Sequence, residues 1–297
     1  MSRTLSPSSN KPYGVARVVS IWNLARSSFY AARHRQQHPC EAQKRGPKVV
    51  SDQALLVEIR KLLDAPVFPG EGYRKIWARL RFAGVRTSKE RVLRLLRENQ
   101  LLSPMRMREP ARSNPHDGTI LTEAPNQMWG TDATATFTEQ DGAVTIFAAI
   151  DHCSADCVGI HAVKKATRFE ALEPIRQAVK EHFGGFSGGI AAGLQLRHDH
   201  GSVYMADDFQ CEIRFLGIES SPAFVRQPEG NGCIERFFRT LKEQLIWIRR
   251  FHDLEELRAA LHEFRERYNN HWILHRLGYR TPAQARRNLT LELPVAA

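Results

Sequence analysis

Three acidic residues, far apart along the chain, lie where a strand or a helix could hold a metal ion. Asp132 falls inside an alternating, threonine-rich segment that predicts a strand, where a carboxylate is costly to bury without charged partners. Asp199 ends a second predicted strand, and Glu235 lies one turn into a predicted helix, with 35 residues between the two. Carboxylates at adjacent strand and helix ends suit Mg²⁺, a hard ion that takes oxygen ligands, or Mn²⁺. Two such ions ~3.5–4 Å apart would activate an attacking oxygen and stabilise a leaving one.

The predicted helix around Glu235 has two distinct faces. Its apolar positions follow a 3.6-residue period and predict a core-facing stripe of Ile234, Phe238, Leu241 and Leu245. Asn231, Glu235 and Lys242 fall on a neighbouring stripe, so an amide, a carboxylate and an ammonium group are directed to one place.

A single acidic residue is most often a solvated surface carboxylate. We expect this of five other candidates in the same half of the chain: Asp151, Asp207, Asp208, Glu229 and Glu243. Asp151 keeps a lower-ranked place among the possible site residues. The three carboxylates together are a stronger signal than any one of them.

The charge of the chain is unevenly distributed. Its 297 residues include 43 Lys and Arg against 32 Asp and Glu, a net charge of +11. Residues 1–114 carry a net charge of +15, and residues 115–297 carry −4. A basic half beside a slightly acidic half predicts that the first half binds a polyanion, and a merely soluble basic domain is the alternative.

Three helical patterns lie between two proline-containing linkers. Gly72 precedes the second pattern, and Ser88 can cap the third. A short connection, Ala83–Ser88, joins the last two helices, which is typical of a helix-turn-helix. The third helix directs three arginines outward, where they could face DNA: Arg91, Arg94 and Arg97. The alternative is an ordinary three-helix bundle with a solvated basic face.

The pattern changes to strands from about residue 125. The predicted order is three strands, a helix, a strand, a short helix, a strand and two long helices over about 231–250 and 253–271. This order indicates an α/β domain with a mixed sheet, preceded by an all-α region. The expected divisions are a small basic helical segment (1–45), a helix-turn-helix domain (50–103), a linker (104–124), a catalytic core (125–285) and a tail (286–297). The first segment contains a weaker helical pattern over 13–35 that could be a second DNA-contacting helix pair.

Five scattered cysteines are an odd set for a disulfide framework, so we expect reduced thiols. A zinc cluster of His152, Cys153, Cys157 and His161 is disfavoured, because Cys157 and His161 fall in one strand pattern and Cys153 lies in its approach, whereas structural zinc needs four closed tetrahedral ligands. No stretch approaches ~20 apolar residues, and the start of the chain lacks the apolar core of a signal peptide. We therefore expect a cytoplasmic, nucleoid-associated protein without a membrane span.

Three sequence blocks carry these carboxylates: Trp129–Asp132, His198–Tyr204 and Asn231–Lys242. They resemble the blocks of the retroviral-integrase-type catalytic core, and are most similar to those of transposases of the insertion-sequence-three group. Residues 72–102 and 268–282 resemble the upstream helix-turn-helix and the closing block of that group. The resemblance implies a ribonuclease-H-like fold with a catalytic and metal-binding triad of Asp132, Asp199 and Glu235.

The resemblance further implies that Lys242 contacts DNA near the active site, and we place Asn231 and Arg239 beside it as DNA contacts. One departure is visible. Many members have Ser before the second Asp, whereas this chain has His198 there and His200 after it. We expect this change to tune the loop without removing a ligand.

These features predict a DNA transposase that cuts and joins mobile-element ends by phosphoryl transfer, with Mg²⁺ or Mn²⁺, two ions to a site, as the cofactor. Water and then a 3′-hydroxyl would be the nucleophile. The expected partners are element-end and target DNA, further copies of the chain on that DNA, and an upstream-frame helix-turn-helix partner or fusion. Two alternatives stay open: a nuclease that cleaves without joining, and a DNA-binding regulator with a catalytically inactive core.

Overall fold

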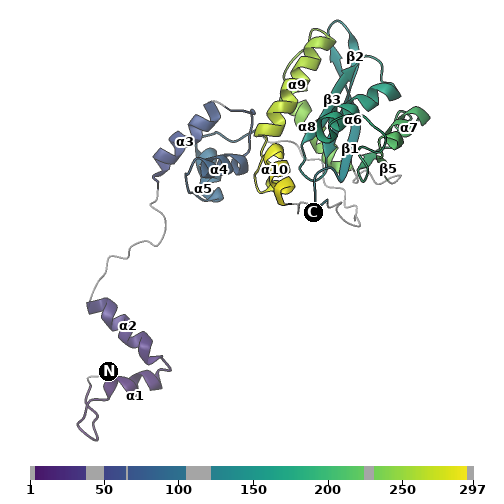
Figure 1. The fold of residues 1–297 in the computed structure, drawn as a ribbon. Coiled ribbons are helices and arrows are strands. Elements are labelled where there is room, and N and C mark those ends of the chain that lie inside the picture. The colour runs from purple at the N-terminus through teal and green to yellow at the C-terminus, as the bar shows by residue number, and fades with distance from the viewer. Residues whose placement is uncertain (1–3, 38–49, 65, 105–121, 224–230, 293–297) are drawn as a thin grey trace. The chain divides into compact units, whose positions relative to one another are not determined.

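A computed structural model describes residues 4–37, 50–64, 66–104, 122–223 and 231–292 (Figure 1). The chain divides into two compact units, Met1–Ser51 and Asp52–Ala297, and each is described by itself. No helix within these described ranges is long and apolar enough to cross a membrane. The predicted linkers around residues 36–48 and 103–125 fall largely outside the described residues.

The first unit holds a helix pair, α1 (Gly14–Ile21) and α2 (Arg26–Gln37), where the sequence pattern over 13–35 predicts one. In the short turn between them, Asn23 has φ 50°, a left-handed conformation that asparagine tolerates. The N–H of Leu24 closes the end of α1 on the carbonyl of Val19 (2.9 Å). Among the described side chains of α2, all but that of Phe29 are exposed. Since residues 1–37 include six Lys and Arg and no Asp or Glu, this surface is basic.

The second unit opens with three helices, α3 (Asp52–Asp64), α4 (Tyr73–Phe82) and α5 (Lys89–Glu98). The predicted turn between α4 and α5 is confirmed. Gly84 follows α4 with φ 81°, which glycine adopts without strain. Ser88 caps α5, since its hydroxyl accepts a hydrogen bond from the backbone N–H of Arg91 (3.1 Å).

Five strands form one mixed sheet in the order β3-β2-β1-β4-β5, and all five are present where the sequence predicts them. β1 (Met128–Thr138), β2 (Gly142–Asp151) and β3 (Cys157–Val163) pair antiparallel. β4 (Gln195–His198) and β5 (Glu219–Pro222) extend the other edge in parallel with β1. The predicted mixed α/β architecture is therefore confirmed.

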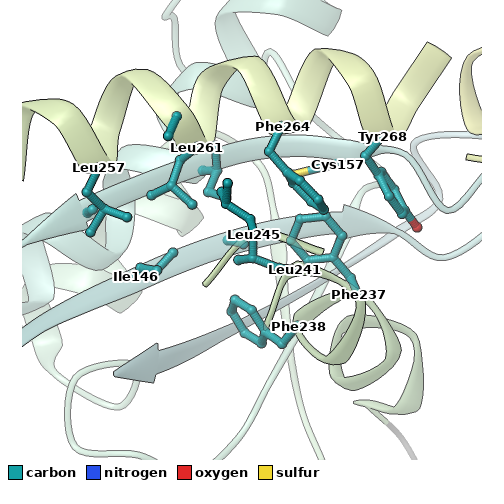
Figure 2. Packing of buried hydrophobic residues seen from close by; sticks show 14 of the residues in the cluster. Ile146, Cys157, Phe237, Phe238, Leu241, Leu245, Leu257, Leu261, Phe264 and Tyr268 are labelled. Atoms are coloured by element: carbon teal, nitrogen blue, oxygen red, sulfur yellow. The ribbon is translucent and has the colours of Figure 1, made fainter. Parts of the chain in front are cut away.

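Helices cover both faces of the sheet, and the alternation along β2 separates two cores. Val144, Ile146 and Ala148 pack with α8 (Gly232–Leu241) and α9 (Leu254–His271). Phe147 and Ala149 pack with α6 (Arg168–Phe183) and α7 (Asp207–Phe215) on the opposite face. In Figure 2, side chains of α9 and α8 meet over the strands in the first of these cores. A residue of β1 can thus be assigned to a face through its partner in β2.

The connection between α3 and α4 joins the helical region to the sheet domain within this unit. Phe68 is completely buried and packs edge-on against Trp272, with ring centroids 4.8 Å apart. The carbonyl of Pro69 accepts a hydrogen bond from the side chain of Gln244 (3.1 Å). The predicted helix-turn-helix region therefore shares part of its core with α8 and α9.

Gly159 is the point of closest approach between β3 and α6. A Cβ placed there would overlap the carbonyl oxygen of Pro174. We expect Gly159→Ala to lower the free energy of unfolding by about 2–3 kcal/mol, because neither backbone can yield without repacking. Gly185→Ala is the matched control, since its Cβ would meet nothing nearer than a methyl of Ile190 at 4.0 Å. Urea unfolding of both variants measures the difference, and equal losses in the two would contradict the close approach.

The carboxyl-terminal helices differ from the prediction in two places. The single helix predicted over about 231–250 stops as an α-helix at Leu241 and continues as one π-helical turn, Lys242–Ile246. The predicted tail from residue 286 is also wrong as far as residue 292, because α10 (Pro282–Glu292) begins before it and continues through it. Proline is favoured in the first turn of a helix. Arg286 then fixes α10 to the sheet domain through buried acidic partners.

Asp151, expected to be solvated, is instead fully buried at the end of β2. Its carboxylate accepts hydrogen bonds from the N–H groups of Asn126 (2.7 Å), Cys153 (2.8 Å) and Ser154 (3.0 Å), and it pairs with Arg286 (3.2 Å). A carboxylate with that many donors is a structural centre of the fold.

The other acidic residues expected at the surface divide. Asp207 and Asp208 are exposed at the start of α7, as predicted. Glu243 is half-buried, because its carboxylate pairs with Arg239 one turn earlier (3.1 Å). Glu229 lies outside the described residues.

Candidate active site

Asp132 lies on β1, on the face of the sheet that α8 covers. Its register partner in β2 is Ala148, which belongs to the core beneath α8 and α9. The side chain is half-buried, and one carboxylate oxygen accepts a hydrogen bond from the N–H of Ala133 (2.8 Å). The strand therefore directs this carboxylate to the same side of the sheet as the helix that carries Glu235.

Asp199 follows the last residue of β4, the parallel neighbour of β1. Gly130 lies opposite Arg197, and Asp132 and Asp199 each stand two residues further along their chains. Adjacent strands lie ~4.8 Å apart, so the two residues are near each other along the sheet. Leu196 packs on the opposite face from Asp132, and since side chains alternate, Asp199, three residues later, is assigned to the face of Asp132. One oxygen of the Asp199 carboxylate accepts a hydrogen bond from the N–H of Gly201 (2.8 Å).

Glu235 is exposed on α8, one turn after Asn231. The predicted apolar stripe of this helix is confirmed: Ile234, Phe238, Leu241 and Leu245 are all buried. That stripe holds α8 against the sheet and leaves Glu235 facing outward. The side chain of Asn231 donates a hydrogen bond to the carbonyl of Thr131 (3.2 Å), so the first turn of α8 is tied to the residue before Asp132.

Electrostatics connect the three carboxylates. Burial raises the pKa of Asp132 from 3.8 to about 6, against the hydrogen bond from Ala133; the negative charges of Asp199 and Glu235 raise it further, and the positive charge of Lys242 lowers it. Each of these charges must lie close enough to Asp132 to be felt. The three predicted ligands and the predicted DNA contact Lys242 therefore face one region of the molecule.

The donor set fits a hard divalent cation, because it offers carboxylate oxygens and gathers negative charge that a cation would relieve. Within the described ranges, no group of three His, Cys, Asp or Glu side chains is close enough to hold a metal ion. Two of the carboxylates instead accept hydrogen bonds from nearby backbone N–H groups, Asp132 from Ala133 within β1 and Asp199 from Gly201 in the loop after β4. A shared ion would require these side chains to rotate.

His198, the departure from the family pattern, is fully buried under the Asp199 loop. Its Nδ1 lies 2.6 Å from the carbonyl oxygen of Asp199, which can only accept, so Nδ1 carries the proton. Burial lowers the pKa of His198, and the neutral ring accepts at Nε2 from the hydroxyl of Ser220 (2.9 Å). The ring also stacks on Tyr204, with centroids 5.6 Å apart. His198 thus anchors the backbone of Asp199, in line with the expectation that it shapes the loop.

The predicted DNA contacts near the site occupy different environments. Lys242 is half-buried and Arg239 is exposed, paired with Glu243. Asn231 is only 6% exposed, because its side chain packs against β1.

Two of the three predicted DNA contacts on α5 already have partners. Arg91 and Arg94 both pair with Asp52 on α3 (2.6 and 2.7 Å), and Arg94 also pairs with Glu98 (3.1 Å). Arg97 is exposed. A phosphate approaching Arg91 or Arg94 would compete with Asp52.

The cysteines are free where the structure describes them, and Cys40 lies outside those residues. Burial raises the pKa of the Cys157 thiol to about 12, so it stays protonated. His161 is bonded through Nε2 to Glu170 (2.6 Å).

Two further residues lie beside the site, His152 and Tyr204, and the sequence pattern gave neither of them an active-site role. His152 directly follows β2 and is buried, although a single histidine after a strand gives no signal of its own. Tyr204 closes the second sequence block; burial, with a smaller contribution from the charge of Asp132, raises the pKa of its hydroxyl.

The buried histidines make a testable prediction about pH. Burial lowers the pKa values of His152 and His182 from 6.5 to about 4, so the unfolded chain binds more protons below pH 6.5. Their contribution to stability is present above pH 6.5 and is lost as the pH falls towards 4. Asp132 has the opposite sign, because its raised pKa adds stability as the pH falls through 6. Two histidines outweigh one carboxyl, so without divalent cations the melting temperature should fall between pH 6.5 and 4.5.

Thermal melts at fixed ionic strength test this expectation. His182→Phe should flatten part of the decline, since that histidine can no longer take up a proton when the chain unfolds. A melting temperature that stays level or rises on acidification across this window would contradict the assignment.

The sequence was compared with known protein families and known proteins. The family described as "HTH-like domain" matches residues 51–109, and the family described as "Integrase core domain" matches residues 216–282. The transposase InsD for insertion element IS2A/D/F/H/I/K of Escherichia coli is 26% identical over 279 residues, covering 92% of this chain and 90% of that protein. The transposase InsD for insertion element IS2-9 of Escherichia coli strain K12 is equally similar.

Among solved structures, a simian T-cell lymphotropic virus intasome in complex with the PP2A regulatory subunit B56 gamma has a TM-score of 0.50 at 22% identity, covering 74% of each chain. The HTLV-2 integrase catalytic core domain in complex with magnesium has a TM-score of 0.42 at 19% identity, covering 55% of this chain and 97% of that one.

The mixed five-stranded sheet behind a helix-turn-helix region is the fold of an integrase-type catalytic core. The matched integrase core family and the transposase relatives indicate an enzyme of the polynucleotidyl transferase type. The similarity to the InsD transposases extends along nearly the whole chain. This protein is therefore a homologue of the IS2 transposases with an HTH-like and an integrase core domain, which supports DNA transposition as its function.

Proposed function

We propose that this transposase cuts and joins mobile-element ends by divalent-cation-dependent phosphoryl transfer at Asp132, Asp199 and Glu235. The observation that supports this most is the raised pKa of Asp132, which burial raises most and the charges of the other two carboxylates raise further. Structural carboxylates in this fold have the opposite arrangement, as Asp151 shows by its set of hydrogen-bond donors and its arginine. Negative charge left uncompensated at one place is what a cation-binding site requires.

In the proposed mechanism, the three carboxylates would hold Mg²⁺ or Mn²⁺, two ions to a site. Such ions, when bound, supply Lewis-acid activation of the attacking and leaving oxygens. Asp132 is fixed by β1, Asp199 by a loop that His198 anchors, and Glu235 by a helix whose apolar stripe is buried. Lys242 would meet a DNA phosphate beside the carboxylates, where its charge is already felt by Asp132. Water and then a 3′-hydroxyl serve as nucleophiles, so no side chain needs to form a covalent intermediate.

The proposed DNA-gripping part is the basic first part of the chain, the segment 1–45 and the helix-turn-helix domain 50–103. The first carries six Lys and Arg and no acidic residue through residue 37, on helices whose side chains are mostly exposed. The second presents Arg91, Arg94 and Arg97 on α5. Phosphate contacts from such residues would supply salt-dependent affinity, and the sheet domain, linked by residues 104–124, would supply the chemistry.

The arginines of α5 give a prediction for DNA binding. Arg91→Ala together with Arg94→Ala should weaken binding to element-end DNA and flatten the plot of log K against log salt, by roughly 0.9 for each lost phosphate contact. Fluorescence anisotropy across a salt series measures this slope. Arg214→Ala removes an exposed arginine from α7 and serves as the control. An unchanged slope in the double variant would mean that these two arginines keep their partner Asp52 and do not contact DNA.

A strand-transfer assay with end-labelled element DNA tests the proposed function as a whole. The expected products are cleaved ends and ends joined to target DNA, both dependent on Mg²⁺ or Mn²⁺. Cleavage without joining would instead identify a nuclease, and DNA binding without either product would identify a regulator with an inactive core. We also propose that the protein acts as an oligomer on paired element ends, alone or with an upstream-frame helix-turn-helix partner.

A further inference from the structure

Two buried polar atoms behind the carboxylates have no partner among the residues that the structure describes. They are Nε2 of His152, on a residue 8% exposed, and Oδ1 of Asn231, on a residue 6% exposed. Both lie against the same backbone position: a Cβ placed on Gly130 would be 2.7 Å from the histidine nitrogen and 2.9 Å from the asparagine oxygen. A buried polar group without a partner costs free energy, so two of them at one place call for an explanation.

The two atoms are complementary. The orientation of the Asn231 amide is set by its nitrogen, which donates to the carbonyl of Thr131 (3.2 Å), so the oxygen that faces His152 is an acceptor. A neutral imidazole carries one N–H, and burial keeps His152 neutral by lowering its pKa to about 4. The two atoms are not hydrogen-bonded to each other in this structure. With the proton on Nε2 and a small approach of the two side chains, His152 would be the donor that Asn231 lacks. Gly130 makes the approach possible because it has no side chain.

His152 is itself held firmly. Its backbone N–H donates to the carbonyl of Met128 (3.0 Å) in β1, and its own carbonyl accepts from a guanidinium nitrogen of Arg276 (3.0 Å). The ring therefore stands on a fixed backbone next to β1. A hydrogen bond from it would fix Asn231 rather than the reverse.

Asn231 in turn stands at the start of the helix that carries Glu235. It is the N-cap residue of α8, and Glu235 follows four residues later on the same side of the helix. Asn231 also touches the carbonyl that precedes Asp132. One side chain thus joins the backbone of the first carboxylate to the helix of the third.

We propose that His152 is a positioning residue of the active site, which donates a hydrogen bond from Nε2 to Asn231 and so holds the first turn of α8 and Glu235 in place relative to Asp132. The inference rests on the proposed function, because it assigns His152 a role toward the cation-binding carboxylates. Mutation of a group that hydrogen-bonds behind a metal ligand typically lowers metal affinity by about 10–100-fold.

The test compares His152→Phe, which removes the donor, with His152→Gln, whose amide nitrogen can still donate. In the full-length protein without DNA, calorimetric titration with Mn²⁺ should show roughly 10-fold weaker binding for H152F and near wild-type binding for H152Q. The Mg²⁺ concentration for half-maximal cleavage should shift in the same way. Should H152F fail to fold, H152Q and His152→Asn replace it, because the shorter amide of asparagine cannot reach and should bind Mn²⁺ weakly.

His182→Phe is the matched control. His182 is also a histidine with a buried Nε2 that lacks a partner in the described part of the chain, but it packs beside Trp129, whose side chain belongs to the other core. Its loss should leave Mn²⁺ affinity unchanged.

Unchanged affinity in H152F, or equal weakening in H152F and H152Q, would overturn the proposal. Unchanged affinity in H152F would point instead to Arg197, which lies opposite Gly130, as the donor to Asn231. If Glu235→Gln binds Mn²⁺ normally and cleaves DNA, the proposed function itself fails. If H152F alone keeps wild-type Mn²⁺ affinity, the role of His152 is wrong and the proposed function stands.

Discussion

Asp132→Asn is expected to abolish divalent-cation-dependent cleavage of element ends while DNA binding survives. The substitution keeps the shape of the side chain and removes the charge that β1 directs toward Asp199 and Glu235. Several kcal/mol of transition-state stabilisation are lost with a bound ion, and each ~1.4 kcal/mol is tenfold in rate, so the cleavage rate should fall by about 10³-fold or more. Asp199→Asn and Glu235→Gln should each have the same effect. Gel assays of cleavage and anisotropy of DNA binding, on the same preparations, measure both quantities.

The same pKa predicts that the loss of activity is not a loss of fold. Because the folded state raises the pKa of Asp132 to about 6, its ionised form at pH 7.5 destabilises the folded protein. Asp132→Asn removes that cost, so its melting temperature without divalent cations should equal or exceed that of the wild type. Asp207→Asn, which removes an exposed charge at the start of α7, should leave cleavage unchanged. Cleavage that persists in any one of the three variants would remove that residue from the triad.

Much of the fold could be predicted because the elements follow local rules. β2 is a nearly continuous apolar run and α8 has a clean 3.6-residue stripe, and both lie where these patterns place them. Ser88 and Gly84 also bound their helices as their side-chain chemistry requires. Such features depend on residues close together in the chain, which is why a single sequence is enough to find them.

The misses concern residues whose role depends on partners far away in the chain. Asp151 looks like any acidic residue at a strand end until Arg286 and Asn126 are placed around it. The pairing of Arg91 and Arg94 with Asp52 joins two helices that the sequence presents separately. The end of α8 was missed for the same reason, since Gln244 turns inward to meet the carbonyl of Pro69. Each of these is a polar contact between residues far apart in the chain, and such contacts leave no periodic pattern or motif in the sequence.

The long-range polar contacts of α10 give the second large expected effect. Arg286→Ala should lower the free energy of unfolding by about 3–5 kcal/mol, because it leaves two buried carboxylates without their cation. Asp151 is fully buried and Asp156 is 4% exposed, and the arginine contacts them at 3.2 and 2.8 Å. It also donates to the side chain of Asn126 (3.0 Å), so its loss affects three groups at once. Urea unfolding monitored by circular dichroism measures the change.

The neighbouring arginine provides the control for this experiment. Arg287 is exposed on the same helix, so Arg287→Ala should change the free energy of unfolding by no more than about 0.5 kcal/mol. Asp156→Asn in the Arg286→Ala background should recover part of the loss, because one of the two unpaired charges is then gone. A loss below about 1 kcal/mol in Arg286→Ala would mean that α10 contributes little to the folded domain, which is what a tail beginning at residue 286 would give. A large loss would make α10 part of the support behind the site, because Asp151 holds the turn that follows His152 by accepting from the N–H groups of Cys153 and Ser154.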